Sequence, residues 1–153
     1  MSNIARLRAF ALCLLLLAIV ALPAAAGLPV AASGDGPKVV FQINDKESAP
    51  TVLRFVTNYL IAEPTAQIAV VGYGPGIDFM LIDAKDPNGK PYEAQLVALA
   101  DRGVAFKVCN NTLKSRNLTP AVVGAQATVV PSAVNEIIRL QTREGYAYFQ
   151  HQK

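Results

Sequence analysis

One cysteine stands where a short apolar run meets a polar segment typical of a helix start. The run Val104–Val108 (VAFKV) predicts a strand, and Cys109 follows it directly. Asn110, Asn111 and Thr112 come next and offer polar groups that could cap a helix or bind something near the sulfur. Free N–H groups and the dipole at a helix N-terminus favour negative charge. A thiol placed here is therefore expected to have a lowered pKa and to form a nucleophilic thiolate.

A glycine-rich loop, GYGPG at residues 72–76, is the second candidate feature. Glycines let backbone N–H groups approach a ligand closely, and we expect Tyr73, Gly74 and Gly76 to form a wall of the pocket around Cys109. The spacing matches neither the dinucleotide-binding G-x-G-x-x-G pattern nor a P-loop. A nucleotide site is therefore not expected, and a tight turn between a strand and a helix is the alternative interpretation.

A purely structural role for Cys109 is the alternative to chemistry. Free cysteine is among the most buried residue types, and a strand end is an ordinary place for it. Two lysines near Cys109 in the sequence could help to lower the pKa of its thiol. Lys107 is expected to lie on the same face of the strand as Cys109, and Lys114 follows five residues later. His151, the only histidine, lies three residues from the end of the chain, so a cysteine–histidine pair is not expected.

No cluster of histidines and cysteines has the spacing of metal ligands, and we expect neither a metal nor a cofactor. Asp45 and Asp78 could be brought together as a carboxylate pair, although nothing in the sequence singles them out.

The first 26 residues predict a cleaved signal peptide. Arg6 and Arg8 precede an unbroken apolar run over residues 9–22, and Pro23 and an Ala-Ala-Ala exit follow. The run is shorter than the roughly 20 residues that span a bilayer, although an uncleaved anchor and a second cut after Ala32 are alternatives. Cleavage makes the protein periplasmic and removes Cys13. Cys109 then stands alone and cannot form a disulfide within the chain.

The charge of the mature chain gives no reason to expect a nucleic-acid partner. Removing Arg6 and Arg8 from the 14 basic residues leaves 12 against 11 acidic ones, a net charge of +1. No basic run is interleaved with aromatic residues, so nucleic-acid binding is not expected. After signal cleavage no membrane association is expected either.

The remaining sequence predicts one α/β domain over residues 38–150, after a flexible Gly/Pro/Ser-rich lead-in at residues 27–37. Apolar, β-branched runs predict strands at 38–43, 67–71, 104–108, 127–130 and 146–150. Helical spacing and stop residues predict helices at 48–61, 77–82, 92–101, 111–116 and 133–143. Ser48 and Ser132 are the expected caps, and Val134, Ile137 and Ile138 are expected to share one helix face. This alternation predicts a three-layer α/β/α sandwich around a mostly parallel five-stranded sheet. The loops after its first three strands, including the one at Cys109, lie at the edge where ligands collect.

Three segments resemble the DsrE/DsrF-like family, which includes sulfur-relay subunits. They are the cysteine segment GVAFKVCNNTLKSRNL, the loop GYGPGIDFML and the closing segment VVPSAVNEIIRLQTREGYAYFQ. The resemblance covers about residues 38–150 and implies an α/β/α sandwich that assembles as a trimer or hexamer. It also implies that Cys109 matches the cysteine that holds sulfur as a persulfide in the relay members.

Together these observations predict a periplasmic sulfur carrier. Cys109 would accept sulfane sulfur from a donor protein or small sulfur species and pass it to an acceptor. The expected activity is that of a sulfur carrier or, at most, of a sulfurtransferase-like enzyme. A non-catalytic oligomeric binding or scaffold module is one alternative, and a redox-sensing thiol is another.

Overall fold

The computed structural model of the protein describes residues 36–151. The predicted signal peptide and residues 27–35 of the predicted lead-in lie outside these described residues. In chain order the elements are β1 (Lys38–Ile43), α1 (Ala49–Ala62), β2 (Gln67–Gly72), the 3₁₀ helix η1 (Gly74–Met80), α2 (Glu93–Ala100), β3 (Ala105–Cys109), α3 (Asn110–Ser115), the 3₁₀ helix η2 (Pro120–Val122), β4 (Ala127–Val130), α4 (Ala133–Glu144) and β5 (Ala147–Gln150).

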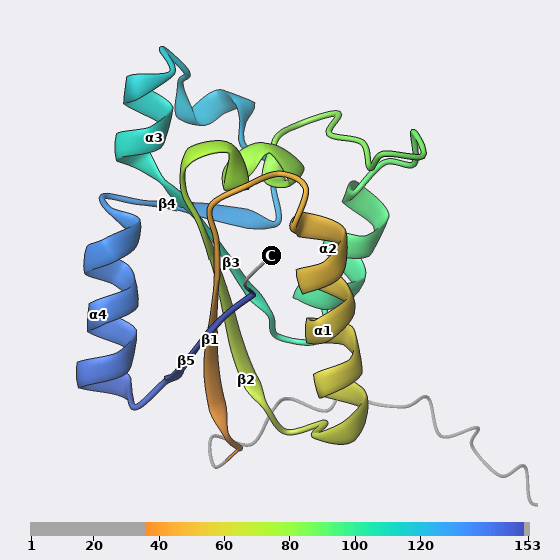
Figure 1. The fold of residues 1–153 in the computed structure, drawn as a ribbon, viewed down its shortest axis with the longest axis vertical. Helices are drawn as coiled ribbons and strands as arrows, with labels where there is room; N and C mark the ends of the chain where they lie inside the picture. The colour runs from red at the N-terminus through yellow and green to blue at the C-terminus, as the bar shows by residue number, and fades with distance from the viewer. Residues whose placement is uncertain (1–35, 152–153) are drawn as a thin grey trace, which may run out of the picture.

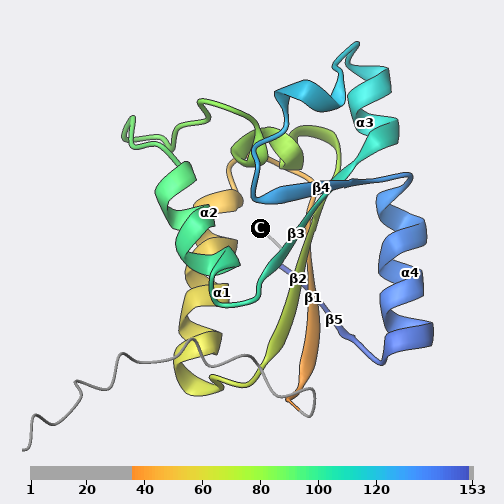
Figure 2. The same ribbon diagram turned by 180° about the vertical axis from the view of Figure 1, so that it is seen from behind.

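The five strands form one sheet in the order β4-β3-β2-β1-β5, and every neighbouring pair is parallel. The chain adds β2, β3 and β4 on one side of β1 and then returns to add β5 on the other side. Right-handed crossovers place a helix on a face that depends on the direction of travel. The return to β5 therefore puts α4 on the face opposite α1 and α2, as Figures 1 and 2 show from two sides.

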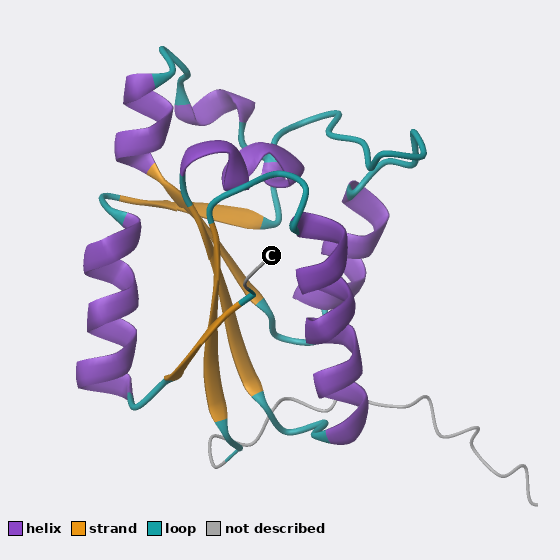
Figure 3. Cartoon of the chain, in the orientation of Figure 1, coloured by secondary structure: helices purple, strands orange, loops and turns teal. Residues whose placement is uncertain are grey.

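The arrangement confirms the predicted three-layer α/β/α sandwich, with helices on both sides of the strands in Figure 3. Alternate strand residues point to opposite faces. Phe106 and Val108 of β3 join the larger core beneath α1 and α2. Cys109 belongs to a smaller cluster beneath α4, and Lys107 reaches Glu136 of α4. The expectation that Lys107 and Cys109 share a face of the sheet is therefore confirmed.

The predicted starts of two helices needed correction. The helix expected at residues 77–82 is a 3₁₀ helix that begins earlier, at Gly74, whose positive φ of 55° favours glycine. Ser48 occupies the N-cap position of α1 but makes no side-chain capping bond. Instead, the carboxylate of Asp45 accepts hydrogen bonds from the Ser48 N–H and hydroxyl, both at 2.8 Å.

The helix α4 begins and ends as its sequence predicts. The Ser132 hydroxyl accepts a hydrogen bond from the Asn135 N–H at 3.4 Å, and Gly145 ends the helix in a left-handed conformation with φ of 76°. Its buried face differs from the expected one, because Ile137 is buried while Val134 and Ile138 are 62% and 52% exposed. Within residues 36–151, no helix has the length and apolar character needed to cross a membrane.

Candidate functional site

The sulfur of Cys109 lies at the carboxyl edge of the sheet, where two helices begin. Cys109 ends β3 and immediately precedes α3. Its strand neighbour is Val130, the last residue of β4, and α4 starts three residues later at Ala133. Parallel strands end at the same edge, so the register of β3 with β4 brings the N-terminus of α4 to the thiol. The Ala133 N–H donates a hydrogen bond to Cys109 Sγ over 3.3 Å.

Thr112 connects the sulfur to the glycine-rich loop. Its hydroxyl oxygen accepts a hydrogen bond from the Gly74 N–H at 2.9 Å, and the same side chain hydrogen-bonds to Cys109. Thr112 is 7% exposed, so this bond is largely protected from water. The contact fixes the start of η1 against the first turn of α3.

These donors lower the pKa of the thiol. Burial of Cys109 raises its pKa, but hydrogen bonds from the Ala133 backbone and from the backbone and side chain of Thr112 lower it. A backbone hydrogen bond from Asn111 acts in the same direction, and the pKa of Cys109 lies below its ordinary value. The donors stabilise the anionic form, which is the nucleophile.

The thiol opens onto a pocket of about 310 Å³. Its lining residues are Tyr73, Cys109, Asn111, Thr112, Ser115, Ser132, Ala133 and Val134. Cys109 itself is only 5% exposed.

The structure brings together some of the residues that the sequence singled out. Tyr73, Asn111 and Thr112 line the pocket with Cys109. Gly74 does not line the pocket, but its N–H donates a hydrogen bond to the Thr112 hydroxyl oxygen. Gly76 and Asn110 are not among the lining residues.

Gly76 has a packing role. A Cβ atom at this position would lie 2.3 Å from the carbonyl oxygen of Ile43, so only glycine fits against the end of β1. Asn110 is partly buried and forms the first residue of α3.

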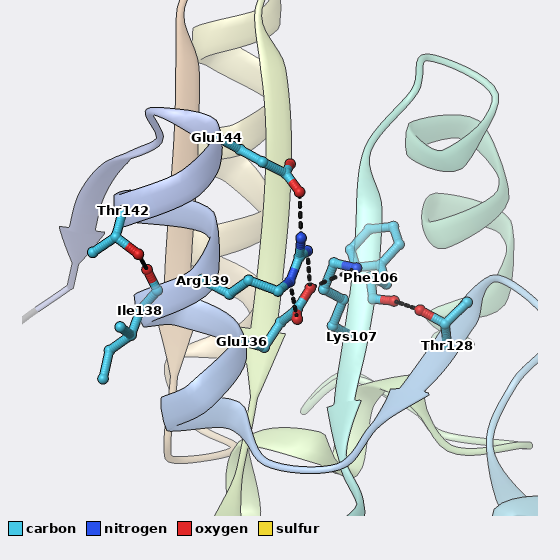
Figure 4. Close-up of polar contacts among 8 residues, drawn as sticks. All are labelled: Phe106, Lys107, Thr128, Glu136, Ile138, Arg139, Thr142 and Glu144. Atoms are coloured by element: carbon cyan, nitrogen blue, oxygen red, sulfur yellow. Dashed lines mark hydrogen bonds and ion pairs between the residues drawn. The ribbon is translucent and has the colours of Figure 1, made fainter.

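A group of charged residues lies between β3 and α4 (Figure 4). The Glu136 carboxylate pairs with Lys107 at 3.0 Å and with Arg139 at 2.8 Å. Arg139 also pairs with Glu144. Hydrogen bonds from Arg139, against an opposing effect of burial and with further help from Lys107, lower the pKa of Glu136 to about 2. Lys107 is therefore held by a carboxylate, and Lys114 is not among the residues that line the pocket.

The other sequence candidates lie elsewhere. The ring of His151 packs against Phe55 of α1, with centroids 5.6 Å apart, on the sheet face opposite Cys109. Asp78 pairs with Arg116 at 2.5 Å, whereas Asp45 holds the start of α1. Among residues 36–151, no group of three or more His, Cys, Asp or Glu side chains is placed to hold a metal ion.

Sequence reasoning missed the contribution of α4 to the thiol. It identified the N-terminus of α3, which follows Cys109 directly, but not the Ala133 N–H, which is 24 residues away. The signal was present in the sequence. Two neighbouring parallel strands, each followed at once by a helix, place both helix N-termini at the same edge.

The fold and site define a class of protein: a parallel α/β sandwich with one buried thiol at the carboxyl edge of its sheet. A family model for the DsrE/DsrF-like family matches residues 37–151. The chain belongs to the DsrE/DsrF-like family, which is associated with sulfur relay. No curated protein matches the chain significantly.

Several solved structures share this fold. A protein of unknown function from Methanobacterium thermoautotrophicum, MTH1491, is 28% identical, with a TM-score of 0.67 over 75% of this chain and 99% of its own. The ychN protein from E. coli is 16% identical, with a TM-score of 0.60 over 74% of this chain and 99% of its own. A protein of unknown function from Bacteroides thetaiotaomicron, BT1422, is 10% identical, with a TM-score of 0.55 over 74% of this chain and 94% of its own.

Proposed function

We propose that this protein is a periplasmic sulfur carrier that holds sulfane sulfur as a persulfide on Cys109. The observation that carries the proposal is the set of hydrogen-bond donors around Sγ, from Ala133, Thr112 and Asn111. Donors of this kind favour the thiolate form of Cys109, which is the nucleophile that accepts the sulfur. Membership of a family associated with sulfur relay supports the same role.

The loading step needs only a thiolate and a sulfane donor. With thiosulfate, the Cys109 thiolate attacks the outer sulfur, a new S–S bond forms, and the sulfur–sulfur bond of thiosulfate breaks to release sulfite. The products are Cys109–S–S⁻ and sulfite, so charge and atoms balance. Transfer reverses this chemistry, because an acceptor nucleophile attacks the terminal sulfur and the Cys109 thiolate leaves.

The pocket suits a small sulfur species better than a protein side chain of the donor. Its volume of about 310 Å³ exceeds the size of a polysulfide or of thiosulfate, but only 5% of the Cys109 surface is exposed. Tyr73 and Val134 are among its lining residues, and Val134 is 62% exposed. A partner protein would collect the sulfur at this exposed side of the pocket.

Treatment of the purified protein with thiosulfate or polysulfide tests the proposal. Mass spectrometry of the peptide that contains Cys109 should show one added sulfur atom, and cyanide should remove it as thiocyanate. Cys109→Ser should show no adduct. Wild-type protein that stays unmodified with every donor would contradict the carrier function.

Two controls separate the alternatives. A scaffold module whose cysteine merely packs predicts that Cys109 resists iodoacetamide in the native protein. A redox sensor predicts an intermolecular disulfide on non-reducing gels after mild oxidation, without a cyanide-labile sulfur. Rapid alkylation together with sulfur loading is the combination expected of the carrier.

The compartment and the oligomer complete the proposal. The N-terminal segment supports export, and fractionation of cells should find a cleaved form in the periplasm.

The protein would act as a trimer or hexamer, as its resemblance to the family implies. Copies of the chain would cover the apolar groove of about 620 Å³ between α1 and β5, where Tyr148 and Phe149 are each 41% exposed. Light scattering should give the mass of the oligomer, and Phe149→Glu should lower it.

A further inference from the structure

Glu136 is a carboxylate in an unusual place. It lies in the first turn of α4 and is only 7% exposed. Burial of a charge is costly unless it is paired and hydrogen-bonded. The side chain meets this need with Lys107 Nζ at 3.0 Å and with Arg139 Nε and Nη2, each at 2.8 Å.

Its two partners come from different elements (Figure 4). Arg139 belongs to α4 itself, so its contact stays within the helix. Lys107 belongs to β3, and its contact with Glu136 ties the helix to the sheet. Of the two contacts of Glu136, only the one with Lys107 therefore connects the first turn of α4 to β3.

The same two segments hold the contact with the sulfur. Lys107 precedes Cys109 by two residues on one face of β3, and Glu136 follows Ala133 by three residues, about one helical turn. The ion pair and the bond from the Ala133 N–H to Sγ are thus two neighbouring connections between β3 and α4. Loss of the ion pair should therefore weaken the hydrogen bond from the Ala133 N–H to Sγ.

We propose that Lys107 and Glu136 are positioning residues that hold the first turn of α4 against β3 and so keep the Ala133 N–H directed at Sγ of Cys109. This inference rests on the proposed use of Cys109 as a nucleophile. Its direct consequence is a more acidic thiol, which is measured without any sulfur transfer.

A direct electrostatic effect on the thiol makes a different prediction. The charged or titratable side chains around the site are Lys107 on β3, Glu136 and Arg139 on α4, and Tyr73 in the loop after β2. Lys114 of α3 and Arg116, which follows α3, are not among the residues that line the pocket. If charge alone acted, removing the negative charge of Glu136 would stabilise the thiolate. If position matters, the same change would weaken the Ala133 contact and destabilise it.

Glu136→Gln is therefore the decisive variant, because Gln keeps the size of Glu but loses its charge. We expect the midpoint of the pH profile for Cys109 alkylation to rise, and the rate at pH 7 to fall roughly three- to tenfold. The matched control is Arg143→Gln, which removes a charge from the last turn of the same helix and should leave the profile unchanged. An unchanged or lowered midpoint in Glu136→Gln would overturn the proposal.

A second pair of variants covers the case in which Glu136→Gln does not fold. Lys107→Met should raise the midpoint and speed hydrogen exchange of the Ala133 amide, whereas Lys107→Arg should restore both values. A raised midpoint without faster exchange would indicate a charge effect alone and contradict positioning. Sulfur loading is a separate readout, so failure of the carrier function would leave these shifts intact.

Discussion

The two faces of the sheet differ in what they bury. Beneath α1 and α2 the buried cluster is the larger one and includes the bulky side chains of Phe79, Phe106 and Met80. Beneath α4 the buried cluster is smaller, and its described members are aliphatic residues such as Ile137 and Leu140 together with Ala133 and Cys109. The helix α4 on this face also buries the charged Glu136. One face is built for apolar burial, and the other holds groups that need specific partners.

This difference shows how the domain accommodates a reactive thiol. Stability from apolar burial scales with the area removed from water, so the larger core under α1 and α2 supplies most of it. The face under α4 can then carry a buried charge and a thiolate, which are costly without hydrogen-bond donors. The donors come from helix N-termini and from Thr112, all at the carboxyl edge.

Truncation of a large side chain in the α1/α2 core should have the largest effect on stability. Phe106 is 1% exposed and packs edge-on against Phe79, with ring centroids 6.4 Å apart. Phe106→Ala should lower the free energy of unfolding by about 3–5 kcal/mol, measured by urea denaturation. Cys109→Ala on the other face should cost only about 1 kcal/mol. If both variants lost the same free energy of unfolding, the two faces of the sheet would not differ in their contribution to stability.

Acid should weaken the α4 face through Glu136. Its pKa falls from 4.5 to about 2 on folding, because Arg139 and Lys107 stabilise the charged form. This contribution is complete above the unfolded pKa and is lost as the pH falls through about 2. Glu136→Gln should remove about 2–3 kcal/mol of stability at pH 7. In urea titrations, the difference in the free energy of unfolding between wild type and Glu136→Gln should shrink between pH 5 and 2. A difference that stays constant with pH would show that it does not come from the charge of Glu136.

Much of the fold was predictable because the strands are short apolar runs with clear boundaries. The runs at 38–43 and 127–130 match β1 and β4 to the residue. The thiol at the end of β3 was predictable for the same reason, since a strand followed at once by a polar segment marks the carboxyl edge. Tyr73, Asn111 and Thr112 then follow from the loops that meet there.

The face that α4 buries was not predictable from apolar spacing. Val134, Ile137 and Ile138 suggested one buried face, yet Ala133, Glu136, Ile137 and Leu140 are the buried residues. The burial of Glu136 depends on Lys107, which lies 29 positions earlier on another element. A pattern within one helix cannot show such a partner. The hydrogen bond from the Ala133 N–H to Cys109 Sγ was missed for the same reason, because it depends on the register of β3 with β4.

Loss of the Thr112 hydroxyl should affect both stability and the thiol. Thr112→Val keeps the shape of the side chain but leaves the Gly74 N–H without its acceptor at 2.9 Å. We expect a loss of about 1–2 kcal/mol in urea denaturation. The midpoint for alkylation of Cys109 should also rise, because a hydrogen bond that lowers the thiol pKa is gone. Thr112→Ser keeps the hydroxyl and is the control. A Val variant that alkylates like wild type would place Thr112 in a purely structural role.

The ion pair between Asp78 and Arg116 should have the smallest effect. It joins η1 to the residue that follows α3 at 2.5 Å, but the two side chains are 32% and 37% exposed. Exposed pairs gain little because water and salt screen them, typically less than about 1 kcal/mol. Asp78→Asn should therefore change the free energy of unfolding by less than about 0.5 kcal/mol and should leave the alkylation profile of Cys109 unchanged. A shift of that profile would show that the pKa of Cys109 depends on this exposed ion pair. The thiol would then respond to exposed charges as well as to the buried hydrogen-bond donors.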